Sequence, residues 1–302
     1  MIQIFKNTNY DFLKVKNLAF IISGSIILIG LISLIMHKGP NYGIDFKGGT
    51  ILQIQFQKDI DVGTIRNSLS KVGLGNSEIK LFGNTREVSI KAEIQKGGKN
   101  TPNIIQDVLS KDFPNNPYEI RRVEEVGPKI GKELVRGAIW SVIFAFLLMG
   151  IYIGWRFEFK FAVGAVISLI HDITITVGVI SLLNIEFDLT IVAAILTLVG
   201  YSLNDTIVIY DRIRENMKLS RKENFQSIIN RSVNETLSRT IVTGLTTIFT
   251  LIVIFVFGGE VIHNFAFTLL FGIITGTFSS VYIASPVVLI WKEKTEQMTR
   301  KK

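Results

Sequence analysis

The fold is decided by the stretch Val199-Gly-Tyr-Ser-Leu-Asn-Asp-Thr-Ile-Val-Ile-Tyr-Asp-Arg-Ile-Arg-Glu-Asn216, which begins inside an apolar run and ends in a charged segment. Asn204 and Asp205 interrupt its apolar part. An ionised aspartate costs about 2.5–3.5 kcal/mol at the centre of an inserted helix. We therefore expect Asp205 to face a partner, a proton or water inside a helix bundle, and not lipid.

The composition around this stretch is that of an integral membrane protein. Of the 302 residues, 48% are hydrophobic, and the mean hydropathy is +0.38. Several windows hold about 20 nearly uncharged residues, enough to cross about 30 Å of hydrocarbon. The net charge of +8 is attributed to membrane topology, because basic residues with interleaved aromatics for nucleic acid are absent. Without cysteine, the chain has no disulfide, iron–sulfur centre or thiolate zinc site.

Six transmembrane helices are predicted from the apolar runs. The first, at 18–36, follows a cytoplasmic N-terminus at 1–17, and we interpret it as a retained anchor. A cleaved signal peptide, the alternative, usually has an apolar region of about 7–15 residues and a small-residue cleavage site. The other five form a bundle over 134–291, followed by a cytoplasmic tail at 292–302; they are expected at 134–154, 161–183, 189–210, 240–257 and 264–291.

Residues 37–133 form one polar domain. Apolar and polar residues alternate at 50–56 and 87–94, and the segments 78–82 and 118–126 also suit strands. Apolar residues recur at helical spacing over 61–72, and Thr101-Pro102 opens a second helix. The order β-α-β-β-α-β predicts a small ferredoxin-like α+β domain.

The distribution of Lys and Arg predicts the orientation. Seventeen basic residues fall in the segments that are cytoplasmic if the N-terminus is inside, and none falls in the outer loops at 184–188 and 258–263. Both termini are therefore expected in the cytoplasm and the polar domain outside, which is the periplasm in a bacterium with two membranes. Asp211, Arg212 and Arg214, at the boundary, are interpreted as topology determinants.

Two further patterns concern helix packing. In the cytoplasmic segment 211–239, apolar residues recur at three- and four-residue steps, which favours an amphipathic helix at the membrane surface, with a solvated hairpin as the alternative. Gly150 and Gly154, like Gly272 and Gly276, have the spacing that lets helices approach closely, although chance produces the same spacing.

The sequence gives no sign of an enzyme. It lacks the Gly-x-x-x-x-Gly-Lys-Ser/Thr loop of nucleotide hydrolases and the His-Glu-x-x-His motif of metalloproteases. Its three histidines, His37, His171 and His263, do not form a metal set, and no serine sits on a nucleophile elbow. We expect no cofactor and no metal, and any active process must draw its energy from elsewhere, most simply an ion gradient.

The intramembrane polar residues remain as candidates. Asp205 lies in the inner half of the fourth span, beside Asn204, and Arg239 sits at the inner entrance of the fifth span. Asp205 is expected about five residues (roughly 7–8 Å) above the level of Arg239, a distance that an arginine side chain can span. The functional hypothesis is a switch, in which ionised Asp205 pairs with Arg239 and protonation releases the arginine. A static ion pair that fixes helix packing is the alternative. Asp172 is a second candidate carrier, unless it only hydrogen-bonds to His171 or a neighbouring helix.

Four segments resemble a known family. Gly43-Ile-Asp-Phe-Lys-Gly-Gly-Thr50 resembles the signature that opens the large external loop of SecD and SecF, the accessory membrane subunits of bacterial protein export. Val126-Gly-Pro-Lys-Ile-Gly131 is similar to their re-entry motif. The segments 200–216 and 234–240 look like the helix-four and helix-five signatures of SecF, and one external domain of about 95 residues fits SecF better than SecD.

The resemblance implies an RND-like half of six helices in the bacterial inner membrane that pairs with SecD. It implies work beside the SecYEG channel with the motor SecA, often with YajC, using the proton gradient to pull unfolded preprotein across the lipid bilayer. By this match, Asp205 and Arg239 occupy relay positions and Asn204 sits beside them, while the principal proton-carrying aspartate belongs to the SecD half. Gly43, Asp45, Gly48 and Gly49 belong to a motif that forms either a hinge or a tight turn.

Two other functions stay open. One is half of a small-molecule RND exporter, and the other is an assembly factor that transports nothing. Sodium is an alternative to protons as the coupling ion. The external domain offers sheet faces and an edge strand that can hold unfolded chain by strand addition, with a simple spacer as the alternative.

Overall fold

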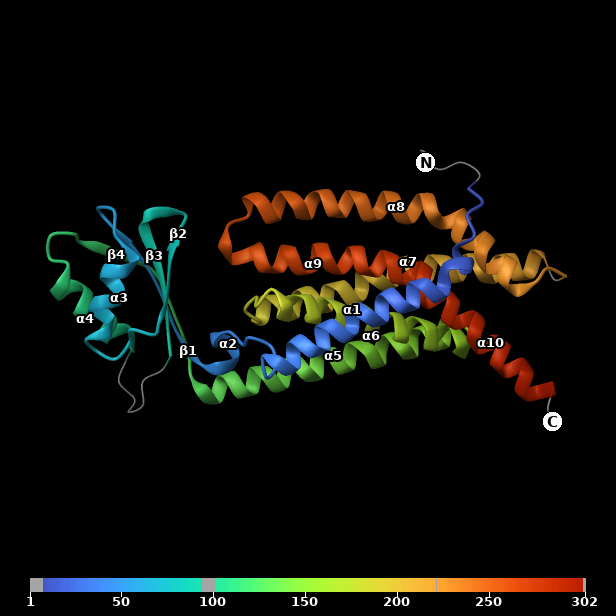
Figure 1. Ribbon diagram of the computed structural model, residues 1–302, viewed down its shortest axis with the longest axis horizontal. Helices are drawn as coiled ribbons and strands as arrows, with labels where there is room; N and C mark the ends of the chain where they lie inside the picture. The colour runs from blue at the N-terminus through green and yellow to red at the C-terminus, as the bar shows by residue number, and fades with distance from the viewer. Residues whose placement is uncertain (1–7, 94–100, 221, 301–302) are drawn as a thin grey trace. The chain divides into compact units, whose positions relative to one another are not determined.

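The computed structural model describes residues 8–93, 101–220 and 222–300 and divides into two compact units, Tyr42–Ile139 and the remainder (Figure 1). The predicted cytoplasmic ends at 1–17 and 292–302 are described in part, because residues 1–7 and 301–302 lie outside the described residues. The same holds for Ile94, the last residue of a predicted strand.

Six helices of the described chain are long and apolar enough to cross a membrane, as predicted. The last is interrupted by a π-helical turn, which the sequence did not indicate. The spans are α1 (Lys16–Met36), α5 (Pro128–Arg156), α6 (Phe159–Leu182), α7 (Leu189–Leu219), α8 (Phe225–Phe257) and the run of α9 (Glu260–Ser279), the π-turn Ser280–Ala284 and α10 (Ser285–Arg300).

The centre of the bundle consists of α6, α7 and the last span. More than half of the most apolar window of each is buried, whereas the window of α5 has no buried residue and that of α8 few. Helix α1 packs against α6, and α8 packs against α7 and α9 (Figure 1). Side chains from α6, α7 and the last span therefore meet where lipid cannot reach them.

Small residues set the closest helix crossings. A Cβ added to Gly272 would lie 2.5 Å from Leu198 Cδ2, and one on Gly276 would lie 3.0 Å from Ser202 Cβ, so α9 approaches α7 too closely for a larger residue. The close packing predicted for this pair is confirmed. The corresponding contacts of Gly150 and Gly154 with α6, at 3.5 and 3.8 Å, are ordinary van der Waals distances.

A second close crossing joins α1 to α6. A Cβ on Gly30 would lie 2.8 Å from the Cα of Gly178, so the two backbones touch. One turn further along α1, Ser33 Oγ and Ser181 Oγ form a hydrogen bond of 2.9 Å in the same buried interface. The first span is therefore fastened to the bundle by backbone contact and by polar groups.

The amphipathic segment is not a separate surface helix. Its residues extend α7 to Leu219 and begin α8 at Phe225, so they form a helical hairpin. Phe225, Ile229 and Val233 are buried in one cluster with Tyr210 of α7. The expectation of a helix lying on the membrane surface is corrected accordingly, because its apolar face is covered by the chain itself.

Two asparagines on α8 hold the segment that precedes α1. Asn234 accepts a hydrogen bond from the Tyr10 amide (2.9 Å) and donates to the Tyr10 carbonyl (2.8 Å). Asn230 accepts from the Phe12 amide and donates to the same Tyr10 carbonyl, each at 2.9 Å. The side-chain amides thus satisfy the backbone groups of Tyr10 and Phe12, and Leu13 beyond them is 1% exposed.

We predict that Asn230→Ala with Asn234→Ala will detach this segment. The amides of Tyr10 and Phe12 lose their acceptors, and their hydrogen-exchange rates should rise by about fivefold or more, since one hydrogen bond contributes about 1 kcal/mol. Gln226→Ala is the control, because Gln226 lies on the same part of α8 and its side chain makes no bond to the segment in the described structure. Unchanged exchange in the double variant would contradict the prediction.

The unit Tyr42–Ile139 has the predicted ferredoxin-like arrangement. Its strands β1 (Gly49–Phe56), β2 (Glu78–Phe82), β3 (Asn84–Ala92) and β4 (Tyr118–Val126) form one antiparallel sheet in the order β2-β3-β1-β4. Helices α3 (Val62–Ser70) and α4 (Thr101–Asp112) bury Ile65 and Leu109 in the core with Leu52. The Lys71 ammonium, 2.6 Å from Asp112, holds the pKa of that carboxyl below its usual range.

The two short glycine motifs meet in this unit. Gly43 precedes a short helix, α2 (Ile44–Lys47), which includes Asp45 and which the sequence did not predict. Gly48 ends it with φ of +81°, a backbone conformation that favours glycine. A Cβ on Gly131 would lie 2.7 Å from the Phe46 carbonyl. The motif forms a tight turn against the start of α5, and its hinge role stays a prediction.

The sheet face opposite α3 and α4 is polar and internally paired. Gln53 Nε2 donates to Glu87 Oε1 (2.6 Å), and Arg122 pairs with Glu124. On the strand β2, Lys80 pairs with its neighbour Glu78. A face whose polar groups already satisfy one another gives an apolar polypeptide segment little to bind.

Candidate functional site

The centre of the bundle holds a carboxylate that only uncharged or imidazole groups contact. Asp172 on α6 is 0% exposed. Its Oδ1 shares a hydrogen bond of 2.9 Å with His171 Nδ1, and its Oδ2 accepts from Ser202 (2.7 Å) and Ser279 (2.8 Å). Among the described residues, no Lys or Arg lies within 4.0 Å of it.

Hydrogen bonds connect this carboxylate on α6 with three other helices, α1, α7 and α9. On one side, His171 Nε2 bonds to Ser23 Oγ of α1 at 2.9 Å. On the other, Ser168 donates to Ser279 at 2.8 Å. The chain Ser23–His171–Asp172–Ser279 is therefore continuous, and every member is 5% exposed or less.

The position of Ser279 at the end of α9 depends on the π-turn. A π-turn inserts one extra residue, so consecutive side chains can face different neighbours. Ser279 bonds to Asp172, while Ser280 bonds to Thr206 of α7 at 2.9 Å. Ser285 Oγ donates to the Ser280 carbonyl at 3.0 Å, which satisfies a carbonyl in the widened turn. Such turns occur frequently at functional sites.

This arrangement is suited to holding or passing a proton. A proton between Asp172 Oδ1 and His171 Nδ1 can belong to either atom without movement of heavy atoms, and the imidazole can change tautomer toward Ser23. Ser202 and Ser279 stabilise the ionised carboxylate through hydrogen bonds. Gly276 leaves the space for Ser202, since a Cβ there would lie 3.1 Å from Ser202 Oγ.

The predicted pair of Asp205 and Arg239 is not in contact. Asp205 is 3% exposed on α7 and lies within electrostatic range of Arg239, whose side chain is exposed on α8. In the described part of the chain they form no ion pair within 4.0 Å, which corrects the expectation of a closed pair in this conformation. Asn204, beside Asp205, is exposed.

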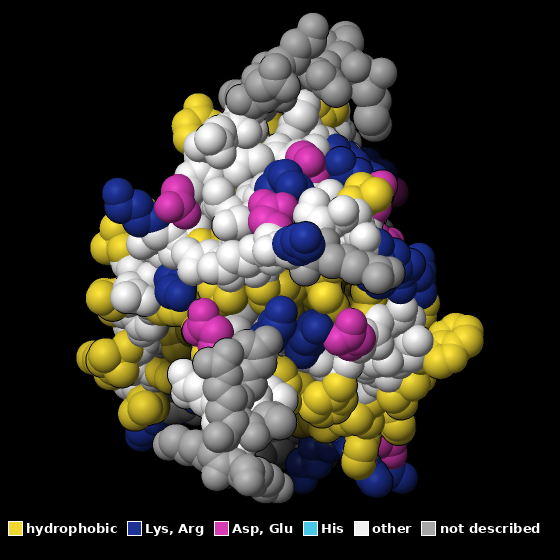
Figure 2. All heavy atoms as spheres, turned by 90° about the vertical axis from the view of Figure 1, so that its right-hand side faces the viewer, with side chains coloured by type: hydrophobic (Ala, Val, Ile, Leu, Met, Phe, Trp, Pro, Cys, Tyr) yellow, Lys and Arg dark blue, Asp and Glu magenta, His cyan; other side chains and the backbone are white. Residues whose placement is uncertain are grey.

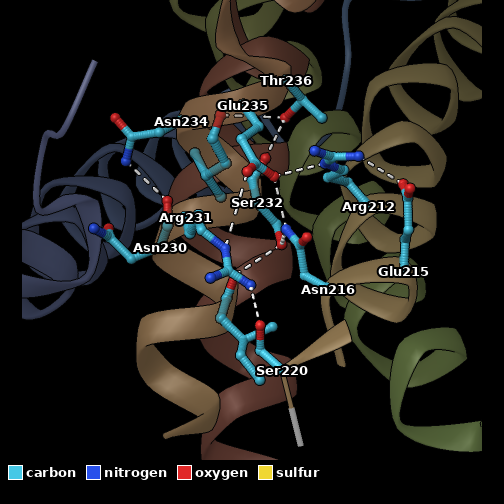
Figure 3. A network of polar contacts seen from close by, with 12 residues as sticks. Arg212, Glu215, Asn216, Ser220, Asn230, Arg231, Ser232, Asn234, Glu235 and Thr236 are labelled. Carbon is cyan, nitrogen blue, oxygen red and sulfur yellow. Dashed lines mark hydrogen bonds and ion pairs between the residues drawn. The ribbon is translucent and has the colours of Figure 1, made fainter. Parts of the chain in front are cut away.

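Hydrogen bonds join α7 to α8 on both sides of the position of Asp205 and Arg239. Nearer the start of α7, Tyr201 donates to the Thr243 carbonyl at 2.9 Å. Toward the hairpin, Arg212 donates to Glu235 at 2.6 Å and Asn216 donates to the same carboxylate at 2.7 Å (Figure 3). Between these links, Thr240 Oγ1 is buried without a hydrogen-bond partner in the described structure.

The boundary residues do more than orient the chain. Figure 3 shows Arg212 between Glu235 and Glu215, and the Glu215 oxygen lies 2.7 Å from Arg212 Nη1. Nearer the start of α8, Arg231 pairs with Glu223 of the α7–α8 connection at 2.7 Å. These pairs hold the hairpin together.

No group of three His, Cys, Asp or Glu side chains suited to a metal occurs among the described residues.

Sequence reasoning found Asp172 but missed the hydroxyls around it. Ser23, Ser202, Ser279 and Ser280 lie on three different spans, and serine is common in membrane helices. The signal available in the sequence was His171-Asp172 in the middle of an apolar run. Which hydroxyls reach it depends on helix rotation and on the π-turn, which no local pattern specifies.

Comparisons with known proteins agree with this architecture. The family model for the protein export membrane protein SecD/SecF, C-terminal, matches residues 105–294, and the model for the SecD/SecF GG motif matches residues 33–60. Protein translocase subunit SecF of Calditerrivibrio nitroreducens is 47% identical over 96% of this chain and 97% of its own. That of Desulfurispirillum indicum is 43% identical over 94% and 92%.

A solved structure agrees as well. The crystal structure of SecDF, a translocon-associated membrane protein from Thermus, matches 95% of this chain with a TM-score of 0.81 and 34% identity. The match covers 39% of that longer chain, so this chain corresponds to a part of it. The sequence, the helix bundle and the four-stranded sheet lead to one conclusion: this chain belongs to the SecD/SecF family of protein-export membrane proteins, in its SecF branch.

Proposed function

We propose that this chain is an accessory subunit of the Sec translocase that acts with a SecD half to couple the proton gradient to preprotein translocation and release on the outer side. It would sit in the bacterial inner membrane with both termini in the cytoplasm. SecYEG, SecA and YajC are the expected partners, and the chain would hydrolyse no nucleotide itself.

One observation carries the proposal. Asp172 is fully buried at the centre of the bundle and is contacted by His171 and two serines. A static structural ion pair would place a guanidinium or an ammonium there, because a buried charge is normally paired. Proton exchange through a hydrogen-bonded chain explains an acidic group kept without a strong cation.

The second part of the mechanism concerns Asp205 and Arg239. The α7–α8 interface is fastened above and below this level, and the two side chains are apart at it. In an alternative conformation, ionised Asp205 would attract Arg239 into the interface beside Thr240. Protonation of Asp205 would return Arg239 to the exposed position, so proton occupancy would become a relative movement of α7 and α8.

The test is preprotein translocation in membrane vesicles, with and without an imposed pH difference. We predict that Asp205→Asn and Arg239→Gln will each abolish the gradient-dependent increase in late translocation while leaving gradient-independent translocation intact. Glu215→Gln is the matched control, since it removes an exposed carboxylate from the same helix. A full gradient response in Asp205→Asn would refute the switch, and a sodium difference that replaces the pH difference would reassign the ion.

A further inference from the structure

The end of the bundle with the α7–α8 connection and α10 carries an ordered group of cations on aromatic rings. Figure 2 looks onto this end, where Lys and Arg side chains lie among hydrophobic ones. Two cations lie over the ring of Phe157, with Arg156 Cζ at 5.4 Å and Arg214 Cζ at 5.3 Å from its centroid. Two more lie over Phe225, with Lys292 Nζ at 4.1 Å and Lys160 Nζ at 5.5 Å.

These four cations form one surface, which we call the basic platform: Arg156, Lys160, Arg214 and Lys292. The rings beneath them belong to one buried cluster, in which Phe161 packs against Phe157 at a centroid distance of 6.0 Å. Lys160 also lies 5.3 Å from the centroid of Phe161. The platform therefore joins the α5–α6 connection to α7, α8 and α10.

The platform brings four like charges together. Arg214 Nη1 donates to the Arg156 carbonyl at 3.1 Å, which holds both guanidiniums at the same ring. Asp211 lies 3.5 Å from both arginines, and Glu158 lies 2.6 Å from Lys160. Basic residues that only set the orientation of a membrane protein need not meet over shared rings, because the positive-inside effect depends on their number and not on their geometry.

Exposed aromatic side chains place the platform at the depth of lipid headgroups. Phe159, next to Lys160, is 69% exposed, and Trp291, next to Lys292, is 40% exposed. Their rings contact each other edge to face at 5.9 Å. Tryptophan is enriched at the membrane–water interface, where an apolar ring meets polar groups. The aromatic pair would lie against the acyl chains directly beside the cations.

We propose that the basic platform binds the phosphate of an anionic phospholipid of the leaflet on this side of the membrane, with its acyl chains along Phe159 and Trp291. Lys160 and Lys292 hold the phosphate, because both ammonium groups lie over the ring of Phe225. Basic pockets between transmembrane helices on the cytoplasmic side bind cardiolipin and related headgroups by the same chemistry. Such a lipid would join α10 to the α5–α6 connection.

The test uses the full chain in detergent and measures lipid retention by native mass spectrometry with cardiolipin, phosphatidylglycerol or phosphatidylcholine added. Wild-type protein should retain the two anionic lipids and not phosphatidylcholine. Lys160→Gln with Lys292→Gln should weaken anionic lipid binding by about 25-fold, since each basic residue near the headgroups contributes about fivefold. Lys160→Arg with Lys292→Arg keeps the charge, reports on folding, and should keep most of the binding.

The matched control is Lys218→Gln with Lys222→Gln, which removes the same charge from exposed positions near the α7–α8 connection that do not stack on rings. This control should bind the lipid like wild type. An equal loss of binding would mean diffuse surface attraction and would overturn the proposal.

A second experiment measures the melting temperature with inorganic phosphate added. If it raises the melting temperature of wild-type protein as much as cardiolipin does, the site recognises free phosphate and the lipid assignment is wrong. Equal retention of phosphatidylcholine would overturn it too.

Discussion

Asp172→Leu should lower the free energy of unfolding of the membrane bundle more than any exposed substitution does. It should also abolish gradient-dependent translocation. The leucine fills the space but leaves His171, Ser202 and Ser279 without their shared acceptor. Interhelical hydrogen bonds in membrane proteins contribute about 0.6 kcal/mol each on average, so three lost bonds correspond to about 2 kcal/mol. Denaturant titration of the detergent-solubilised protein measures this loss directly.

Asp172→Asn separates packing from proton chemistry. The amide has the same shape and can still accept from the serines, so the free energy of unfolding should change by less than about 1 kcal/mol. It cannot ionise, and the gradient response in vesicles should therefore be lost. If Asp172→Asn retained the full response, Asp172 would be a packing residue that only holds four helices together.

Gly178→Leu should separate α1 from α6. A Cβ at this position would lie 2.9 Å from the Cα of Gly30, a backbone atom that cannot rotate away. Overpacking of this kind costs about 1–3 kcal/mol, and the shift would also break the Ser33–Ser181 and Ser23–His171 bonds. We therefore expect lower stability and a weaker gradient response in the same variant, because the hydrogen-bonded chain from Asp172 reaches α1 through His171.

The separation can be measured with introduced cysteines. The chain has no cysteine, so Ser33→Cys with Ser181→Cys forms a disulfide only with its intended partner. Cross-linking should be fast in the parent and slow when Gly178→Leu is added. Gly24→Leu, on the exposed side of α1 with no atom within 4 Å, should leave the rate unchanged. Equal rates in all three proteins would mean that the glycines do not set the crossing.

The sequence by itself determined the number of the membrane helices and the fold of the polar domain. Long uncharged runs cannot stay in water, and alternating strands with Gly83 at their turn leave few other pairings, so local pattern is enough. It also identified Asp172 and Asp205, since a carboxylate in an apolar run is costly wherever the helix points. The bounds of α7 and α8 were harder to predict, because an amphipathic stripe is the same whether it faces lipid or another helix.

Only the tertiary structure decided which polar groups meet. The rotation of α6, α7 and α9 and the extra residue in the π-turn bring Ser202 and Ser279 to Asp172, and the Gly30–Gly178 crossing brings Ser23 to His171. The same rotations bury Asp205 while leaving Arg239 exposed. Contacts between distant segments depend on how many side chains pack along each helix, so no single stretch of sequence specifies them.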